Sequence, residues 1–122
     1  MIGYVTLGTN DFPRAVAFYD KLLGALGAKR AFEMDRAVSW STGPDSPGLG
    51  VCKPFDGKAA TRGNGTMVAL AVDSKEKVDA IYKLALELGG TDEGKPGPRG
   101  DGFYAAYFRD LDGNKLNCFF MG

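Results

Sequence analysis

Hydrophobic and polar positions follow one order at the start of the chain. Residues 2–9 alternate in the manner of a β-strand, and apolar side chains then recur at helical spacing as far as Leu26. Asn10 or Asp11 is expected to cap this helix, and Pro13 suits its first turn, where a missing N–H costs nothing. The pattern then predicts three short strands, at 29–34, 37–41 and 48–53.

The same order restarts after residues 54–65, which are rich in Gly and Lys. Residues 66–73 repeat the pattern of the first strand, and Ser74 is a good cap for a second amphipathic helix that ends near Leu88. Residues 94–100 contain three Gly and two Pro, so we interpret them as a loop, either a mobile flap or a plain linker. A strand at 102–109 follows. The chain therefore reads as two β-α-β-β-β copies offset by roughly sixty residues, too few for an open repeat array.

The closing strand carries the most distinctive polar residue. Asp112-Gly113-Asn114 predicts a tight turn into it, because Gly and Asn accept positive φ at little cost. Strand alternation then places Asn117 on the face opposite that of its neighbours Leu116 and Cys118. Asn117 is thus either a polar residue on a solvated sheet face or a contact to a ligand.

Composition narrows the class of protein. The chain has 122 residues, 44% of them hydrophobic, which fits one globular domain over 1–122, with modules at about 1–55 and 66–122 and a linker at 56–65. Fifteen basic residues balance fifteen acidic ones without a charged block, which argues against nucleic-acid binding. No leader or membrane-spanning run is evident, so a cytoplasmic protein is expected. Histidine is absent, which removes the commonest general base and metal ligand.

Three stretches together resemble a known family. They are the opening Gly3-Tyr4-Val5-Thr6-Leu7 leading to Asn10-Asp11 and Phe18-Tyr19, the restart at 67–73, and the ending Asp110-Leu111-Asp112-Gly113-Asn114-Lys115-Leu116. The chain resembles the vicinal oxygen chelate superfamily, the glyoxalase, bleomycin-resistance and extradiol-dioxygenase group. The resemblance implies an α+β fold in which two βαβββ modules form curved mixed sheets around a cup, with the helices on the outer face.

The resemblance also indicates where a metal would be held. Metal-dependent members use four inward side chains, and these positions fall at Tyr4, at Gly50 or Cys52, at Met67 and at Asn117. Imidazole and carboxylate groups build sites for Zn, Ni, Fe and Mn, whereas these residues bind such ions weakly. We therefore expect no metal and no other cofactor.

The altered cup suits a small, partly aromatic molecule, because its lining combines rings, a thioether and isolated hydrogen-bonding groups. The candidate ligand-binding residues are Tyr4, Thr6, Trp40, Cys52, Met67, Tyr104, Tyr107, Asn117 and Phe119. Several have an alternative role: Tyr4 in the core, Met67 as a gap filler, and Trp40 in subunit packing.

Three functions fit this interpretation. The favoured one is a glyoxalase/bleomycin-resistance-like protein that binds a small molecule in a metal-free cup. The first alternative is a lyase or isomerase similar to lactoylglutathione lyase, for which Glu33, Asp35, Asp101 and the tyrosines are loose acid–base candidates and no catalytic residue is assigned. The second is a structural dimer with a filled cup. A homodimer is expected in each case, with no nucleic-acid or membrane partner.

Overall fold

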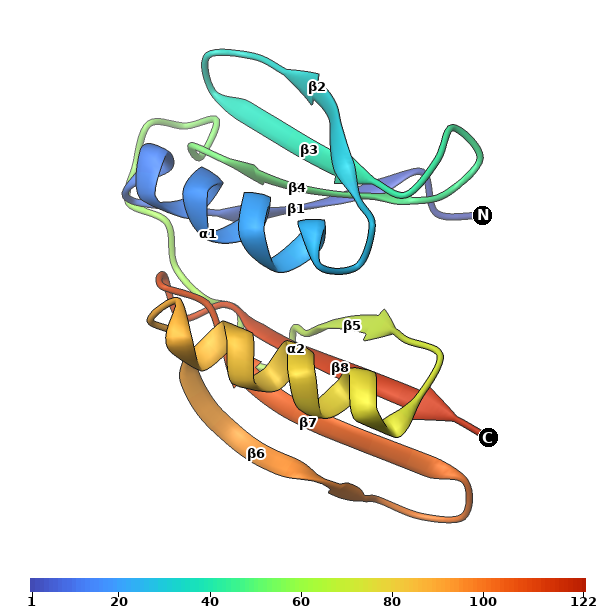
Figure 1. The fold of residues 1–122 in the computed structure, drawn as a ribbon. Coiled ribbons are helices and arrows are strands. Elements are labelled where there is room, and N and C mark those ends of the chain that lie inside the picture. The colour runs from blue at the N-terminus through green and yellow to red at the C-terminus, as the bar shows by residue number, and fades with distance from the viewer. The chain divides into compact units, whose positions relative to one another are not determined.

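A computed structural model describes all residues, Met1–Gly122, and the chain divides into two compact units, Met1–Thr61 and Arg62–Gly122 (Figure 1). The first unit contains β1 (Tyr4–Gly8), α1 (Phe12–Gly24), β2 (Lys29–Glu33), β3 (Ala37–Ser41) and β4 (Gly48–Cys52). The second contains β5 (Val68–Ala71), α2 (Lys75–Glu87), β6 (Thr91–Pro98), β7 (Phe103–Arg109) and β8 (Lys115–Met121). Each unit is a βαβββ module, which confirms the predicted α+β class.

The two sheets have the same topology. Their strand orders are β1-β4-β3-β2 and β5-β8-β7-β6. In each sheet the first and last strands of the module pair in parallel, and the other pairs are antiparallel. One helix packs on one face of its own sheet, so each sheet has a helix face and an opposite face, called the distal face below. Side chains alternate between these two faces along every strand.

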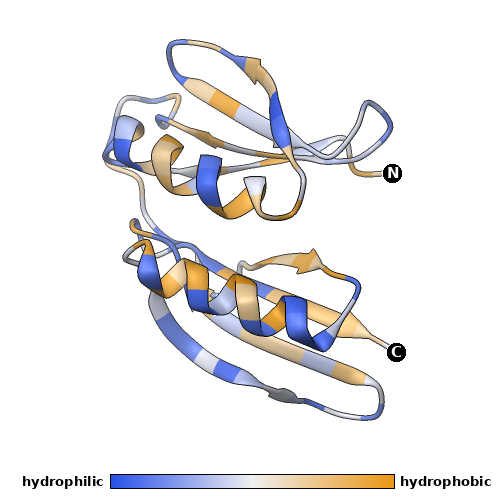
Figure 2. Ribbon diagram, in the orientation of Figure 1, coloured by the Kyte–Doolittle hydropathy of each residue, from blue (hydrophilic) through white to orange (hydrophobic).

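Helix α1 begins where the sequence predicts. The Asp11 side chain caps it by accepting a hydrogen bond from the backbone N–H of Arg14, at 3.2 Å, and proline occupies its first turn. Its apolar stripe is buried against β3 and β4, and Figure 2 shows the alternation of hydrophobic and hydrophilic positions along the helix. The helix ends at Gly24, and Gly27 then adopts φ +83°, a conformation that glycine accepts without a Cβ clash.

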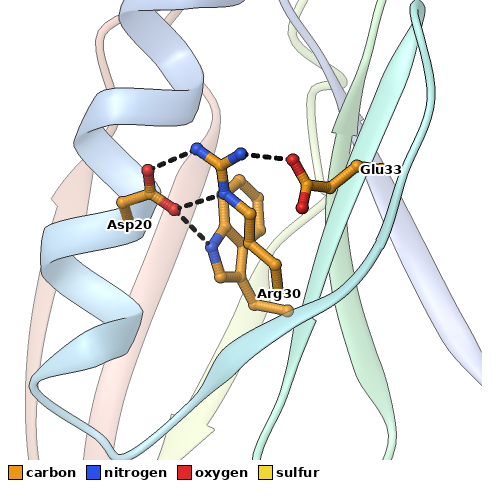
Figure 3. Close-up of polar contacts among 4 residues, drawn as sticks. Asp20, Arg30 and Glu33 are labelled. Carbon is orange, nitrogen blue, oxygen red and sulfur yellow. Dashed lines mark hydrogen bonds and ion pairs between the residues drawn. The ribbon is translucent and has the colours of Figure 1, made fainter.

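A polar cluster ties α1 to the sheet of the first unit (Figure 3). The Trp40 indole donates to Asp20 Oδ1 at 2.9 Å, and the Arg30 guanidinium donates to both oxygens of the same carboxylate, at 2.9 and 2.7 Å. Arg30 also donates to Glu33 at 2.6 Å. The hydrogen bond from Arg30 lowers the pKa of Asp20 below its ordinary value. One carboxylate thus joins α1, β2 and β3.

The second unit is held by α2 over β7 and β8. Ser74 caps the helix, as predicted, by accepting from the Lys77 N–H at 3.1 Å. The Cys118 thiol lies fully buried beneath the helix and donates to the Val78 carbonyl at 3.6 Å. Burial raises the pKa of Cys118 to about 12, so the thiol stays protonated. Neither helix is long and apolar enough to cross a membrane.

Strand β6 differs from the prediction, which placed residues 94–100 in a loop. Residues up to Pro98 instead pair with β7, with two irregularities in register between Asp92 and Gly97. The strand lies at the edge of its sheet, where proline removes no ladder hydrogen bond that the fold needs. The interpretation of this segment as a mobile flap is therefore wrong.

The turn between β7 and β8 forms as predicted, but a different aspartate organises it. Gly113 has φ +89°, as the tight-turn motif requires. The buried Asp110 carboxylate accepts from the N–H groups of Asp112 and Asn114, both at 2.9 Å, and from the Asn114 amide at 3.0 Å. The turn thus fixes the direction in which β8, and with it Asn117, leaves the loop.

Candidate functional site

The distal face of the second sheet centres on Asn117. Asn117 pairs with Ala69 on the β5 side and with Tyr107 on the β7 side. The alternation along β8 places Leu116 and Cys118 on the helix face, as predicted, and Asn117 and Phe119 on the distal face. The amide therefore stands between a small side chain and a tyrosine ring.

The Asn117 side chain is buried without a full set of partners. The residue is only 2% exposed, and its Oδ1 accepts no hydrogen bond. Nearly all buried polar atoms in native proteins have a partner, so an orphaned amide oxygen needs an explanation. A donor supplied by a ligand would provide one.

Aromatic and cationic groups lie on the same sheet as Asn117, around its neighbour Tyr107 and around Phe119. The Tyr107 ring has the Arg99 guanidinium carbon 5.6 Å from its centroid and Lys115 Nζ at 5.5 Å. The Phe119 and Phe103 rings lie 5.5 Å apart. This face thus offers flat apolar surface next to positive charge, which suits a planar, electron-rich molecule.

A carboxylate balances part of this charge. Glu93 on β6 accepts from Arg109 Nε at 2.5 Å, and this hydrogen bond lowers the pKa of Glu93. Glu93 thus stays ionised and paired. No ion pair involves Arg99 or Lys115, whose cationic groups lie beside the Tyr107 ring.

The distal face of the first sheet carries a second aromatic pair. Tyr4 and Phe32 contact edge to face, with centroids 6.2 Å apart, and their side chains are 62% and 39% exposed. Thr6 is exposed on the same face and Cys52 is half-buried. Phe32 is not among the predicted site residues, but it pairs with Ser39 in register and so shares the distal face of the sheet.

Two predicted site residues lie on the helix faces instead. Trp40 is buried beside Tyr19, with ring centroids 5.8 Å apart, and its indole binds Asp20. The Tyr104 hydroxyl donates to Asp79 on α2 at 2.7 Å, which raises the pKa of Tyr104. Both side chains are satisfied within their own modules, so neither belongs to the distal-face site. Met67 is exposed next to the first residue of β5.

The residues at the four metal positions do not fit a divalent ion. Of the two alternatives for the second position, Gly50 has no side chain and Cys52 offers a lone thiol. The other three positions offer the phenol of Tyr4, the thioether of Met67 and the neutral amide of Asn117. No group of three or more His, Cys, Asp or Glu side chains in the chain could hold a metal ion. Hard and borderline ions prefer carboxylate or imidazole donors, which these positions do not supply.

Fold and site together define a protein built from two βαβββ modules, each with a helix face and a distal face. The family model described as "Glyoxalase/Bleomycin resistance protein/Dioxygenase superfamily" matches residues 1–118. The chain belongs to this superfamily, as the motifs predict. No curated protein matches the chain.

Solved structures support this assignment. A glyoxalase/bleomycin resistance protein from Albidiferax ferrireducens T118 is 36% identical, with a TM-score of 0.89, and the match covers 98% of this chain and 97% of that one. A family enzyme from Burkholderia phytofirmans PsJN is 21% identical, with a TM-score of 0.78 and coverage of 96% and 95%. Lactoylglutathione lyase from Agrobacterium tumefaciens is 21% identical, with a TM-score of 0.72 and coverage of 98% and 92%. The last two show the shared fold alone.

Proposed function

We propose that the chain binds a small, partly aromatic molecule on its distal faces without a metal ion. Asn117 is the anchor of the site, since its amide oxygen can accept a hydrogen bond and no group of the protein donates one. This unpartnered oxygen is the observation that carries the proposal. Tyr107 and Phe119 lie on the same face and provide the ring contacts.

The polarity of Asn117 constrains the ligand. The unpartnered Asn117 oxygen selects a ligand that carries an N–H or O–H donor next to an aromatic ring. A ligand without that donor would leave the Asn117 oxygen without a hydrogen bond. Arg99 and Lys115 favour an electron-rich ring over a cationic one. Indole-like and phenol-like molecules therefore fit this face best.

A matched pair of ligands tests the proposal. Indole carries an N–H donor and 1-methylindole lacks it, so the purified protein is titrated with each while backbone amide shifts are followed by NMR. We expect indole to bind about tenfold more tightly, the effect of one hydrogen bond of about 1.4 kcal/mol, and to shift the amides of β7 and β8.

Substitution at Asn117 supplies the control. Asn117→Leu should remove the preference for indole, while Asn64→Leu, the same change at an exposed linker position, should leave the preference intact. Equal affinities of the wild-type protein for the two indoles would refute the role of Asn117.

Two further measurements separate this proposal from catalysis by a glyoxalase-like enzyme. Turnover of the hemithioacetal of methylglyoxal, measured with and without a chelator, would favour a lyase or isomerase in place of a binding protein. Mass analysis of the purified protein reports metal content. A stoichiometric, tightly bound transition metal would overturn the metal-free part of the proposal.

A further inference from the structure

The first unit contains a hollow of about 390 Å³, lined only by residues of that unit. Three segments line it: the link from β1 to α1, the turn between β2 and β3, and the chain that follows β4. They meet because β1 and β4 are parallel, so both strands finish at the same end of the sheet. The antiparallel β2–β3 hairpin turns at that end as well.

The charged side chains that line this hollow are all basic. Arg36, Lys53 and Lys58 all line it, and no Asp or Glu does. None of the three forms an ion pair. The nearby Asp56 carboxylate accepts from the backbone N–H of Lys58 at 3.0 Å and lies outside the lining. Like charges around one concavity raise the local potential and favour an anion there.

Hydrogen bonds hold the loop that carries two of these cations. Arg36 Nη2 donates to the carbonyls of Lys53 and Pro54, at 3.1 and 2.8 Å. At the other end, Asn10 donates to the Ala60 carbonyl at 3.1 Å and accepts from the Ala60 N–H at 2.7 Å. The loop is fixed at both ends, so little ordering remains to oppose ligand binding.

Aromatic rings form part of the wall. Phe55 is 93% exposed, with the Arg36 guanidinium carbon 5.2 Å from its centroid. Lys53 Nζ lies 5.8 Å from the centroid of Phe12, which also lines the hollow. A planar ligand would cover the bare Phe55 ring and remove apolar surface from water.

We propose that this hollow binds a small organic dianion that carries a planar ring, in the manner of an aryl phosphate. Two negative charges match three unpaired cations better than the single charge of a carboxylate. The ring would lie against Phe55, and the anionic group would face Arg36, Lys53 and Lys58. The site is independent of the Asn117 face, so either can fail while the other stands.

The charge requirement can be tested on the wild-type protein. Amide shifts are followed by NMR during titration with phenyl phosphate, benzoate and benzyl alcohol, which carry falling negative charge on similar rings. We expect affinity to decrease in that order, with shifts concentrated at 9–12, 36 and 53–60. Shifts centred elsewhere, or equal affinity for the three probes, would overturn the proposal.

Variants then test the residues. Lys58→Gln should weaken phenyl phosphate binding about tenfold, consistent with the loss of one charge-assisted hydrogen bond. Lys83→Gln, at an exposed position on α2, should have no effect, and an equal loss there would indicate unspecific attraction. Phe55→Ala should lower the affinity for phenyl phosphate to that for inorganic phosphate; an unchanged advantage of phenyl phosphate would contradict ring stacking. Asn117→Leu should leave this binding unchanged.

Discussion

Replacing Asn117 with leucine is expected to stabilise the protein. The Asn117 side chain is 2% exposed, and its Oδ1 has no hydrogen-bond donor. A buried, unsatisfied polar atom costs about 1–3 kcal/mol, and leucine is similar in size and has no polar atom to desolvate. Some of the gain is lost because the branched side chain must repack beside Tyr107 and Ala69. We expect a net gain of about 1–2 kcal/mol in the free energy of unfolding.

The assay must report on the second unit. The single tryptophan, Trp40, lies in the first unit, so its fluorescence need not follow unfolding around Asn117. Far-UV circular dichroism during urea and thermal unfolding covers both units. For a chain of this size, 1 kcal/mol corresponds to a shift of about 3–5 °C in Tm. The variant should therefore melt several degrees above the wild type.

Two comparisons make the result decisive. Asn64→Leu, in the exposed linker, should change Tm little. Asn117→Asp should be strongly destabilising near pH 7, because it buries a charge without a partner. A Tm for Asn117→Leu equal to or below that of the wild type, with unaltered secondary structure, would refute the argument that the amide is unsatisfied. A gain in stability together with the loss of indole selectivity would mark a residue retained for binding.

Three further predictions concern the cores and the assembly. Asp20→Asn should lower stability at pH 7 by about 1 kcal/mol, a figure reduced for solvent screening of the half-exposed pair with Arg30. Because the folded-state pKa of Asp20 is lowered, its contribution to the free energy of unfolding is present above about pH 4 and is lost as the pH falls through that lowered pKa. The urea midpoints of the wild type and Asp20→Asn should therefore converge in acid. At pH 8 an aromatic disulfide reagent should modify Cys52 and spare buried Cys118 until the chain unfolds; modification of both in the folded protein would contradict the structure. The expected homodimer stays a prediction, and a monomer in light scattering at micromolar concentration would count against it.

The sequence predicts the helices and most strands because their signals are local. Asp11 and Ser74 are good caps, and apolar residues at helical spacing must face a core whatever the remaining chain does. The same holds for the facing of Asn117, which follows from alternation once β8 is recognised. The family resemblance then adds the expectation of a cup, which periodicity alone does not give.

The pairing of β6 and the partners of Trp40 and Tyr104 could not be predicted, for equally physical reasons. Strand β6 contains Gly and Pro at positions typical of loops, and only its place at the sheet edge, a property of the whole fold, makes it tolerable. Trp40 and Tyr104 were assigned to the site for their chemistry. Their partners, Asp20 and Asp79, lie on helices distant in the sequence, and no local pattern announces those hydrogen bonds.

The division of each sheet into two faces explains how the positions that the resemblance implies for metal ligands can carry other residues while the chain still folds. The helix faces carry the buried cores, including Ile81 and Leu116, so substitutions there would cost several kcal/mol. The metal positions that the resemblance implies fall on the distal faces or, for Met67, beside one of them. An amide at position 117, in place of a metal-binding side chain, leaves the core of the module intact. It changes what the distal face can bind. If the proposed function holds, the unpartnered Asn117 oxygen is a consequence of that change: a polar group kept in a buried position for the ligand that it binds.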